Sequence, residues 1–106
     1  MHLLRVSLTS WVDDDQPGFV SGTFVDAEGR SHHIVDKVPI FTRENLTADG
    51  PWPQPGHVCC AVRKFWSDSQ GRELAEIDTD RYGIVSDAGE TRFNVSATEL
   101  EEVEDY

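Results

Sequence analysis

Positive charge is scarce in this chain of 106 residues. Nine Lys and Arg residues stand against twenty Asp and Glu residues, and the formal net charge at pH 7 is −11. An acidic surface repels the phosphate backbone of nucleic acids, and it repels anionic membrane surfaces for the same reason. We therefore expect neither a nucleic acid nor a membrane as a partner.

Long apolar runs and a cysteine framework are also missing. The longest apolar run, residues 58–62, is far shorter than the ~18 residues that a membrane span needs. Arg5 and Ser7 interrupt the apolar N-terminal segment, so it does not have the form of a signal peptide. The two cysteines, Cys59 and Cys60, are adjacent and would point to opposite faces of a strand, so they cannot join two elements. We expect a cytoplasmic protein.

Motifs that carry catalysis are absent as well. The sequence has no Gly-x-Ser-x-Gly, no His-Glu-x-x-His and no glycine-rich phosphate loop. Residues 78–83 resemble the start of a calcium loop, but Tyr82 offers no carboxylate at position five, and position twelve is Gly89. We therefore expect no cofactor, and an enzyme is the minority interpretation.

Alternation of apolar and polar residues is the main pattern that is present. Apolar side chains occupy most even positions from Leu4 to Val12, which predicts a strand with one wet face. The acidic, proline- and glycine-containing stretch 13–18 ends it. By the same reasoning we predict strands over residues 19–25, 32–38, 58–66, 73–79, 82–85 and 91–95, helical turns within 42–49 and 96–99, and a last short strand carrying Leu100 and Val103.

These strands predict an all-β fold, a small single-domain antiparallel barrel or roll over residues 1–106. An irregular Pro-rich loop, 39–56, and an acidic C-terminal tail, 97–106, complete the domain. The C-terminal order of strand, helical turn and short strand resembles the end of an SH3-like barrel, where the turn carries the chain between sheets. The alternative is an OB-like barrel, whose longer connection between the third and fourth strands matches the loop.

The Pro-rich loop and the acidic clusters are the candidate interface. Trp52 lies among Pro51, Pro53 and Pro55, so it would lose little entropy on docking and offers the large apolar area that binding hot spots use. The alternative is that it folds back as a lid over an open end of the barrel. The interface candidates are Trp52, Pro53, Pro55, Asp13, Asp14 and Asp15.

The acidic tail, which holds five acids and no base, either solubilises the chain or complements a basic protein. We expect a bacterial-type, cytoplasmic interaction module, in the manner of an inhibitor or immunity-like protein that masks a basic partner surface. The alternative is a small metal-binding protein or metal-dependent enzyme. It would use His57, Cys59 and either His32 or His33 as ligands.

Overall fold

The computed structural model describes residues 1–15 and 17–104, so Gln16 of the predicted turn and the last two residues of the predicted tail lie outside it. Strands account for 52% of the chain, and the prediction of an all-β antiparallel barrel or roll is confirmed. The strands are β1 (His2–Asp13), β2 (Phe19–Val25), β3 (Ser31–Lys37), β4 (Gln54–Ser67), β5 (Glu73–Asp78), β6 (Arg92–Ser96) and β7 (Leu100–Glu102). The helical pieces are α1 (Val38–Phe41) and the 3₁₀ turns η1 (Asp80–Tyr82) and η2 (Ala97–Glu99).

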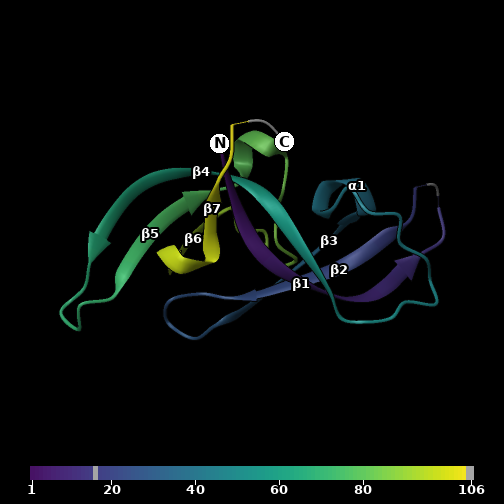
Figure 1. Ribbon diagram of the computed structural model, residues 1–106, viewed down its shortest axis with the longest axis horizontal. Coiled ribbons are helices and arrows are strands. Elements are labelled where there is room, and N and C mark those ends of the chain that lie inside the picture. The colour runs from purple at the N-terminus through teal and green to yellow at the C-terminus, as the bar shows by residue number, and fades with distance from the viewer. Residues whose placement is uncertain (16, 105–106) are drawn as a thin grey trace.

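One strongly curled antiparallel sheet organises the molecule, with the strand order β3-β2-β1-β4-β5-β6 and with β7 added beside β1. In Figure 1, the arching end of β4 forms one half with β5 and β6, β2, β3 and α1 form the other, and β1 runs beside the start of β4 between them. Single backbone hydrogen bonds join the two flanks of the curl. The amide of Ala27 donates to the Asn94 carbonyl at 2.8 Å, and that of Asp87 donates to the His33 carbonyl at 2.9 Å.

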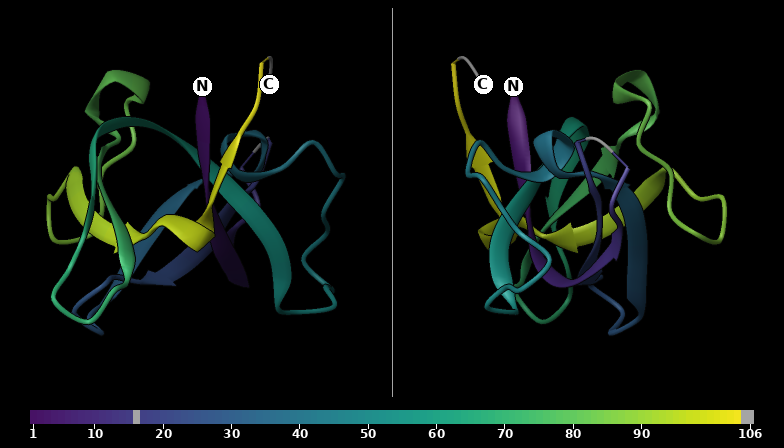
Figure 2. Two further views of the ribbon diagram at one scale, coloured as in Figure 1. Left: turned by 60° about the vertical axis from the view of Figure 1, so that its left-hand side comes forward. Right: turned by 90° about the vertical axis from the view of Figure 1, so that its right-hand side faces the viewer.

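The C-terminal element order that resembles an SH3-like barrel is present. The 3₁₀ turn η2 follows β6, the Ser96 hydroxyl accepts a hydrogen bond from the Thr98 amide, and β7 then pairs with the start of β1. The start of β1 and β7 consequently run side by side (Figure 2), and the Val103 amide donates to the Met1 carbonyl. The long connection between the third and fourth strands, on which the OB-like alternative depended, is present too.

Alternate side chains of the strands form the core. The fully buried apolar residues include Leu4, Leu8, Val20, Ile34, Phe41, Val58, Ile77, Ile84 and Val95. In β2, Val20 and Phe24 point inward with Gly22 between them, as the alternation predicts. A β-carbon on Gly22 would lie 2.9 Å from the Phe41 ring, so the absence of a side chain lets α1 pack down on the sheet.

The alternation in β1 does not continue to Val12 as predicted. A register shift between Leu8 and Ser10 adds a residue to β1 opposite β2, which reverses the side on which later side chains point. Val12 is therefore exposed, while Trp11 packs partly against the core. A bulge of this kind leaves no mark on the hydrophobic pattern.

Two other predicted elements are wrong. Residues 82–85 form no strand: η1 ends at Tyr82, and the chain then turns back so that the Thr79 hydroxyl donates to the Ile84 carbonyl at 2.7 Å. The helical turn is at Val38–Phe41 rather than within 42–49. Pro39 favours that position, because proline is accommodated in the first turn of a helix.

The Pro-rich loop ends earlier than predicted, because β4 begins at Gln54 and includes Pro55. Over Gln54–Cys60, β4 pairs with β1, and its pairing with β5 starts only at Ala61. At Pro55 one side of the strand therefore carries a partner strand and the other, within the part of the chain that the structure describes, does not, and proline is tolerated at such edges.

We found no helix in residues 1–15 and 17–104 with the length and apolarity to cross a membrane.

The adjacent cysteines alternate as predicted, with Cys60 buried in the core and Cys59 half-buried on the other face. Burial raises the pKa of the Cys60 thiol to about 12, and the neighbouring Cys59 thiol adds to this rise. Burial also raises the pKa of Cys59. The thiolate is the reactive form, so the two thiols should differ in reactivity.

We predict that a thiol reagent at pH 8 modifies Cys59 in the native protein and leaves Cys60 unmodified. A rise from the ordinary value of 9.0 to about 12 lowers the thiolate fraction about a thousandfold, and the core blocks access as well. Mass spectrometry of protein labelled with and without denaturant measures this. Equal labelling rates in the native protein would contradict the strand register.

Candidate functional site

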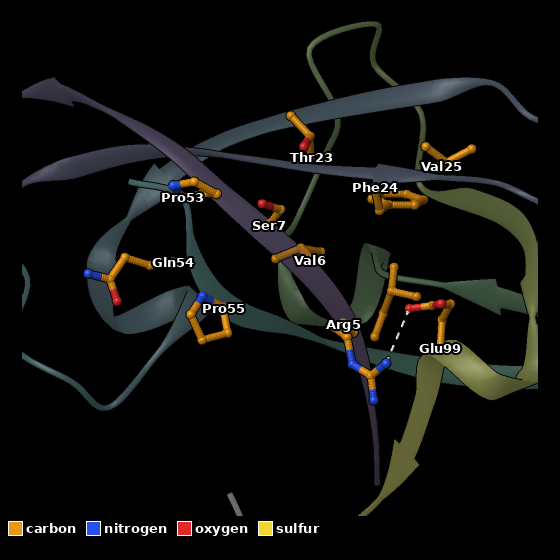
Figure 3. Close-up of a pocket in the computed structure, with 11 residues that line it drawn as sticks. Arg5, Val6, Ser7, Thr23, Phe24, Val25, Pro53, Gln54, Pro55 and Glu99 are labelled. Atoms are coloured by element: carbon orange, nitrogen blue, oxygen red, sulfur yellow. Dashed lines mark ion pairs between the residues drawn. The ribbon is translucent and has the colours of Figure 1, made fainter. Parts of the chain in front are cut away.

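The candidate site lies where the neighbours of β1 diverge. On one side of β1, pairing with β7 ends at Leu4 and pairing with β2 begins at Ser7. Between these points, at Arg5 and Val6, β2 and β7 separate, and a groove of about 610 Å³ opens (Figure 3). This volume lies within the range of typical ligand pockets, roughly 300–1,000 Å³.

The groove lining is mainly apolar. Its apolar members are Leu4, Val6, Phe24, Val25, Pro53 and Pro55. Its polar members are Arg5, Ser7, Thr23, Gln54 and Glu99. Figure 3 shows Pro53 and Pro55 at one end and Arg5 with Glu99 at the other. Val25, on the wall formed by β2, is 57% exposed, so an apolar surface here faces solvent.

Only two of the lining residues, Arg5 and Glu99, are charged, and they pair with each other. Arg5 Nη1 lies 3.8 Å from Glu99 Oε2; the Arg5 side chain is largely solvent-exposed, and that of Glu99 is partly exposed. Exposed pairs of this kind contribute little to stability, about 0–1 kcal/mol. A ligand can therefore take either charge from its present partner at small cost.

Acidic side chains continue from the groove along η2 and β7. We call Glu99, Glu101, Glu102 and Glu104 the acidic strip. Glu101 lies 3.9 Å from His57 Nε2, and Glu102 lies 3.6 Å from His2 Nε2. With histidines counted as neutral, as in the formal net charge, the four carboxylates of the strip add a negative field beside one end of the apolar groove.

The predicted interface residues do not form one surface. Pro53 and Pro55 line the groove, but Trp52 is half-buried against the core, and its indole N–H donates to the Ala48 carbonyl at 3.4 Å. Trp52 thus packs back against the core, while its role in an interface stays a prediction.

The predicted acidic cluster lies at the C-terminal end of β1, whereas the acidic strip runs beside the N-terminal end. Asp14 accepts a hydrogen bond from the Trp11 indole at 2.7 Å, and Asp13 accepts one from the Asp15 amide at 2.9 Å. Two of these three carboxylates thus have local structural partners.

Sequence reasoning missed the groove residues on β1 and β2. Thr23 and Val25 occupy the face of β2 that the alternation assigns to solvent. The alternation assigns Val6 to the core. An exposed valine at the end of a strand was the available signal. The divergence of β2 from β7 is a tertiary feature and leaves no local pattern.

The residues of the metal alternative are not brought together. His57 and Cys59 share a face of β4 as expected, but His57 pairs with Glu101. His32 is buried and bonded to Asp26. Within residues 1–15 and 17–104, no group of three His, Cys, Asp or Glu side chains has a geometry that could hold a metal ion.

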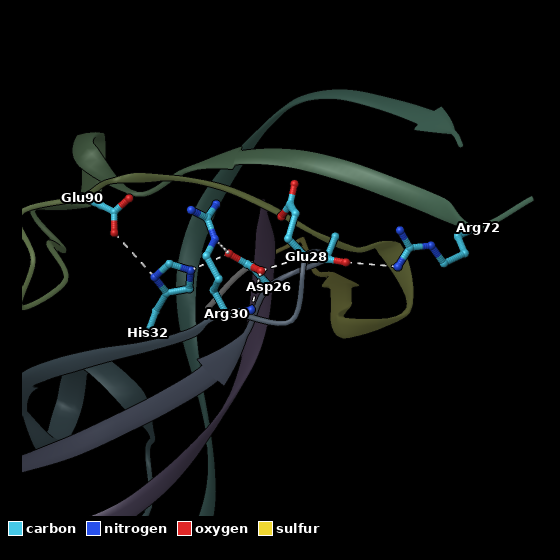
Figure 4. A network of polar contacts seen from close by, with 7 residues as sticks. Asp26, Glu28, Arg30, His32, Arg72 and Glu90 are labelled. Carbon is cyan, nitrogen blue, oxygen red and sulfur yellow. Dashed lines mark hydrogen bonds and ion pairs between the residues drawn. The ribbon is translucent and has the colours of Figure 1, made fainter. Parts of the chain in front are cut away.

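A second polar cluster surrounds His32 at the β2–β3 hairpin (Figure 4). Its Nε2 lies 2.7 Å from Asp26 Oδ2, and its Nδ1 lies 3.6 Å from Glu90 Oε1. The imidazole stacks on Phe24 and meets the edge of Phe93, with ring centroids 5.1 and 4.8 Å away. The adjoining cavity, about 150 Å³, is much smaller than the groove.

Asp26 is the centre of this cluster. Burial acts to raise the pKa of its carboxyl group, but the hydrogen bond from His32, those from the Arg30 and Glu28 amides, and the Arg30 charge together hold this pKa below its ordinary value of 3.8. The carboxylate is fully occupied by these donors. We interpret the cluster as a structural clamp on the hairpin.

The same turn occurs twice in the chain. Residues 26–30 and 68–72 both read Asp-x-x-Gly-Arg. In each, the Asp carboxylate accepts hydrogen bonds from the amides two and four residues later and from the Arg Nε. The two hairpins also touch, since Arg72 Nη1 donates to the Ala27 carbonyl at 3.1 Å. The Asp-x-x-Gly-Arg motif therefore specifies hairpin turns rather than a catalytic or binding site.

We predict that Asp26→Asn lowers the free energy of unfolding by about 2–4 kcal/mol at pH 7, because the substitution breaks a buried charged network. Asp68→Asn, in the exposed twin turn, should cost much less. The folded-state pKa of Asp26 is lowered, so its stabilisation is present above pH 3.8 and is lost as pH falls through the folded value. Urea unfolding at pH 7 and pH 3 should show the wild-type advantage over Asp26→Asn shrinking. Equal losses in the two turns would contradict the clamp.

A further prediction concerns Trp52. Because its indole packs against the core, Trp52→Ala should lower the free energy of unfolding by about 2–3 kcal/mol. Phe65→Ala is the control: that ring is 56% exposed, and its loss should stay within about 0.5–1 kcal/mol. Denaturant unfolding of both variants measures this. A fully stable Trp52→Ala protein would show that the indole does not act as a lid.

In comparisons with protein-family models, curated proteins and solved structures, the chain has no match. The groove and the acidic strip are therefore the features from which function is inferred.

Proposed function

We propose that this chain is a small acidic protein-interaction module that binds a basic protein, in the manner of an inhibitor or immunity-like protein that masks a basic surface. The observation that supports this most is the position of the acidic strip at the end of an exposed apolar groove. Specific interfaces combine these two elements, an apolar centre and a charged rim.

The two elements would contribute differently to binding. Apolar contact in the groove supplies affinity and slows dissociation, because it removes apolar area from water. The acidic strip acts over a longer range: it steers a basic partner toward the groove and disfavours acidic ones. The net charge of −11 strengthens this steering.

The groove is also suited to binding by its rigidity. Pro53 and Pro55 have restricted backbones, and β1 is hydrogen-bonded to β4 along the groove floor. A preformed surface loses little conformational entropy when it binds. Its apolar lining contains no nucleophile paired with a base, so binding is the function that it supports.

The experiment starts with capture of partners from the source cells and reconstitution of the complex from purified proteins. We predict a basic partner and salt-sensitive association. Raising the ionic strength from about 0.05 M to about 0.5 M shortens the Debye length from roughly 14 Å to about 4 Å, so the association rate should fall far more than the dissociation rate rises. Stopped-flow or surface-based kinetics measures both rates.

Charge reversal tests whether the acidic strip causes the salt-sensitive association. The double substitution E101K/E102K should slow association about tenfold or more at low salt, because it inverts the field beside the groove. E28K/D80K makes the same change in net charge at exposed positions elsewhere and should slow association much less. A partner that is not basic, or equal effects of the two double substitutions, would count against the proposal.

A further inference from the structure

We infer that the groove seats an extended segment of the partner, with an apolar side chain against Val25 and a neighbouring Lys or Arg on Glu99. This inference rests on the proposed function and specifies the partner's binding element. It depends on the shape of the groove, on its strand edges and on its one charged pair.

Shape and edges favour an extended chain. The groove, about 610 Å³, is open along the line where β2 leaves β1, and it runs from Pro55 to Glu99 (Figure 3). Within the described chain, Arg5 and Val6 have no strand partner on this side, because pairing with β7 stops before them and pairing with β2 starts after them. Short extended segments bind such edges through their main chain and place alternate side chains in pockets.

Charge identifies the kind of segment. The pair between Arg5 and Glu99 is 3.8 Å long and exposed, so an incoming cation can take Glu99 while Arg5 turns to solvent. Glu101 and Glu102 follow directly and favour a second cation. A second copy of this chain is a poor occupant, since each copy carries a net charge of −11.

Two exposed valines provide a matched test. Val25 lines the groove and is 57% exposed, whereas Val35 on β3 is 48% exposed and lies outside the lining. Neither supports the core, so Val25→Arg and Val35→Arg should both fold, with melting temperatures close to that of the wild type. A displayed library of random 12-residue peptides is selected on the wild-type protein, and the enriched peptides are synthesised and titrated by fluorescence anisotropy.

We expect the enriched peptides to combine an apolar residue with nearby Lys or Arg. Val25→Arg should weaken their binding tenfold or more, on the order of the 1.4 kcal/mol that a tenfold change represents, while Val35→Arg should leave it unchanged. Glu99→Gln should weaken binding several-fold, whereas Glu28→Gln, at an exposed turn position, should not. Replacing the peptide's basic residue with norleucine should abolish the difference between wild type and Glu99→Gln.

Several results would overturn the inference. These are a selection that enriches nothing, peptides that bind Val25→Arg as tightly as wild type, and peptides without basic residues whose binding ignores Glu99→Gln. Binding of the uncharged dye Nile red that is lost in Val25→Arg, with no enriched peptide, would assign the groove to a small apolar ligand instead.

The outcomes also separate this inference from the proposed function. A basic partner that binds Val25→Arg normally but associates slowly with E101K/E102K would overturn the groove inference and leave the proposed function standing. Groove-dependent peptide binding without any basic cellular partner would support the groove as a peptide site and count against the proposed function.

Discussion

The pairing of β1 is the constraint on which the rest of the structure depends. One side of β1 is held by β4, and its other side is shared between β7 at the start and β2 at the end. Both halves of the roll therefore meet on a single strand. Leu8, wholly buried at the centre of β1, fits there because Gly56, which pairs with Val6 and lies diagonally across from Leu8 on β4, has no side chain: a β-carbon at Gly56 would lie 2.9 Å from the Leu8 side chain. The shared side also creates the groove, since two neighbours of one strand edge cannot continue past each other.

The two polar features of the molecule differ in how fully they are satisfied. At the β2–β3 hairpin, Asp26 accepts four hydrogen bonds and is nearly inaccessible to solvent, so its network specifies local structure. At the groove, Arg5 and Glu99 meet at the long end of ion-pair distances in solvent. A satisfied buried network resists exchange of partners, and an exposed loose pair permits it. This contrast separates a structural cluster from a binding site more clearly than residue type does.

The acidic residues fall into the same two groups, those held in structural networks and those that are loosely paired in solvent. Several acids build turns and strand pairs with arginines, as in Asp68 with Arg72 and Asp78 with Arg92. Backbone hydrogen bonds, from Arg72 and Asp80 respectively, and the arginine contacts keep the pKa of each of these two carboxyls below its ordinary value. The acidic strip meets Arg5 and two histidines, and it carries much of the uncompensated charge. Negative charge thus remains where the groove ends.

The sequence by itself determined the strand content, the alternation that buries Val20, Phe24 and Cys60, and the turn that leads into β7, because these depend on neighbouring residues with a period of two. Only the tertiary structure decided the rest. The bulge after Leu8 turned the Val12 side chain outward, and the edge of β4 allowed Pro55 to lie within a strand. The Trp52 side chain packs against the core. The groove belongs to this second group. Its walls come from segments up to ninety-odd residues apart, and the way β2 and β7 divide one edge of β1 depends on packing that no local pattern encodes.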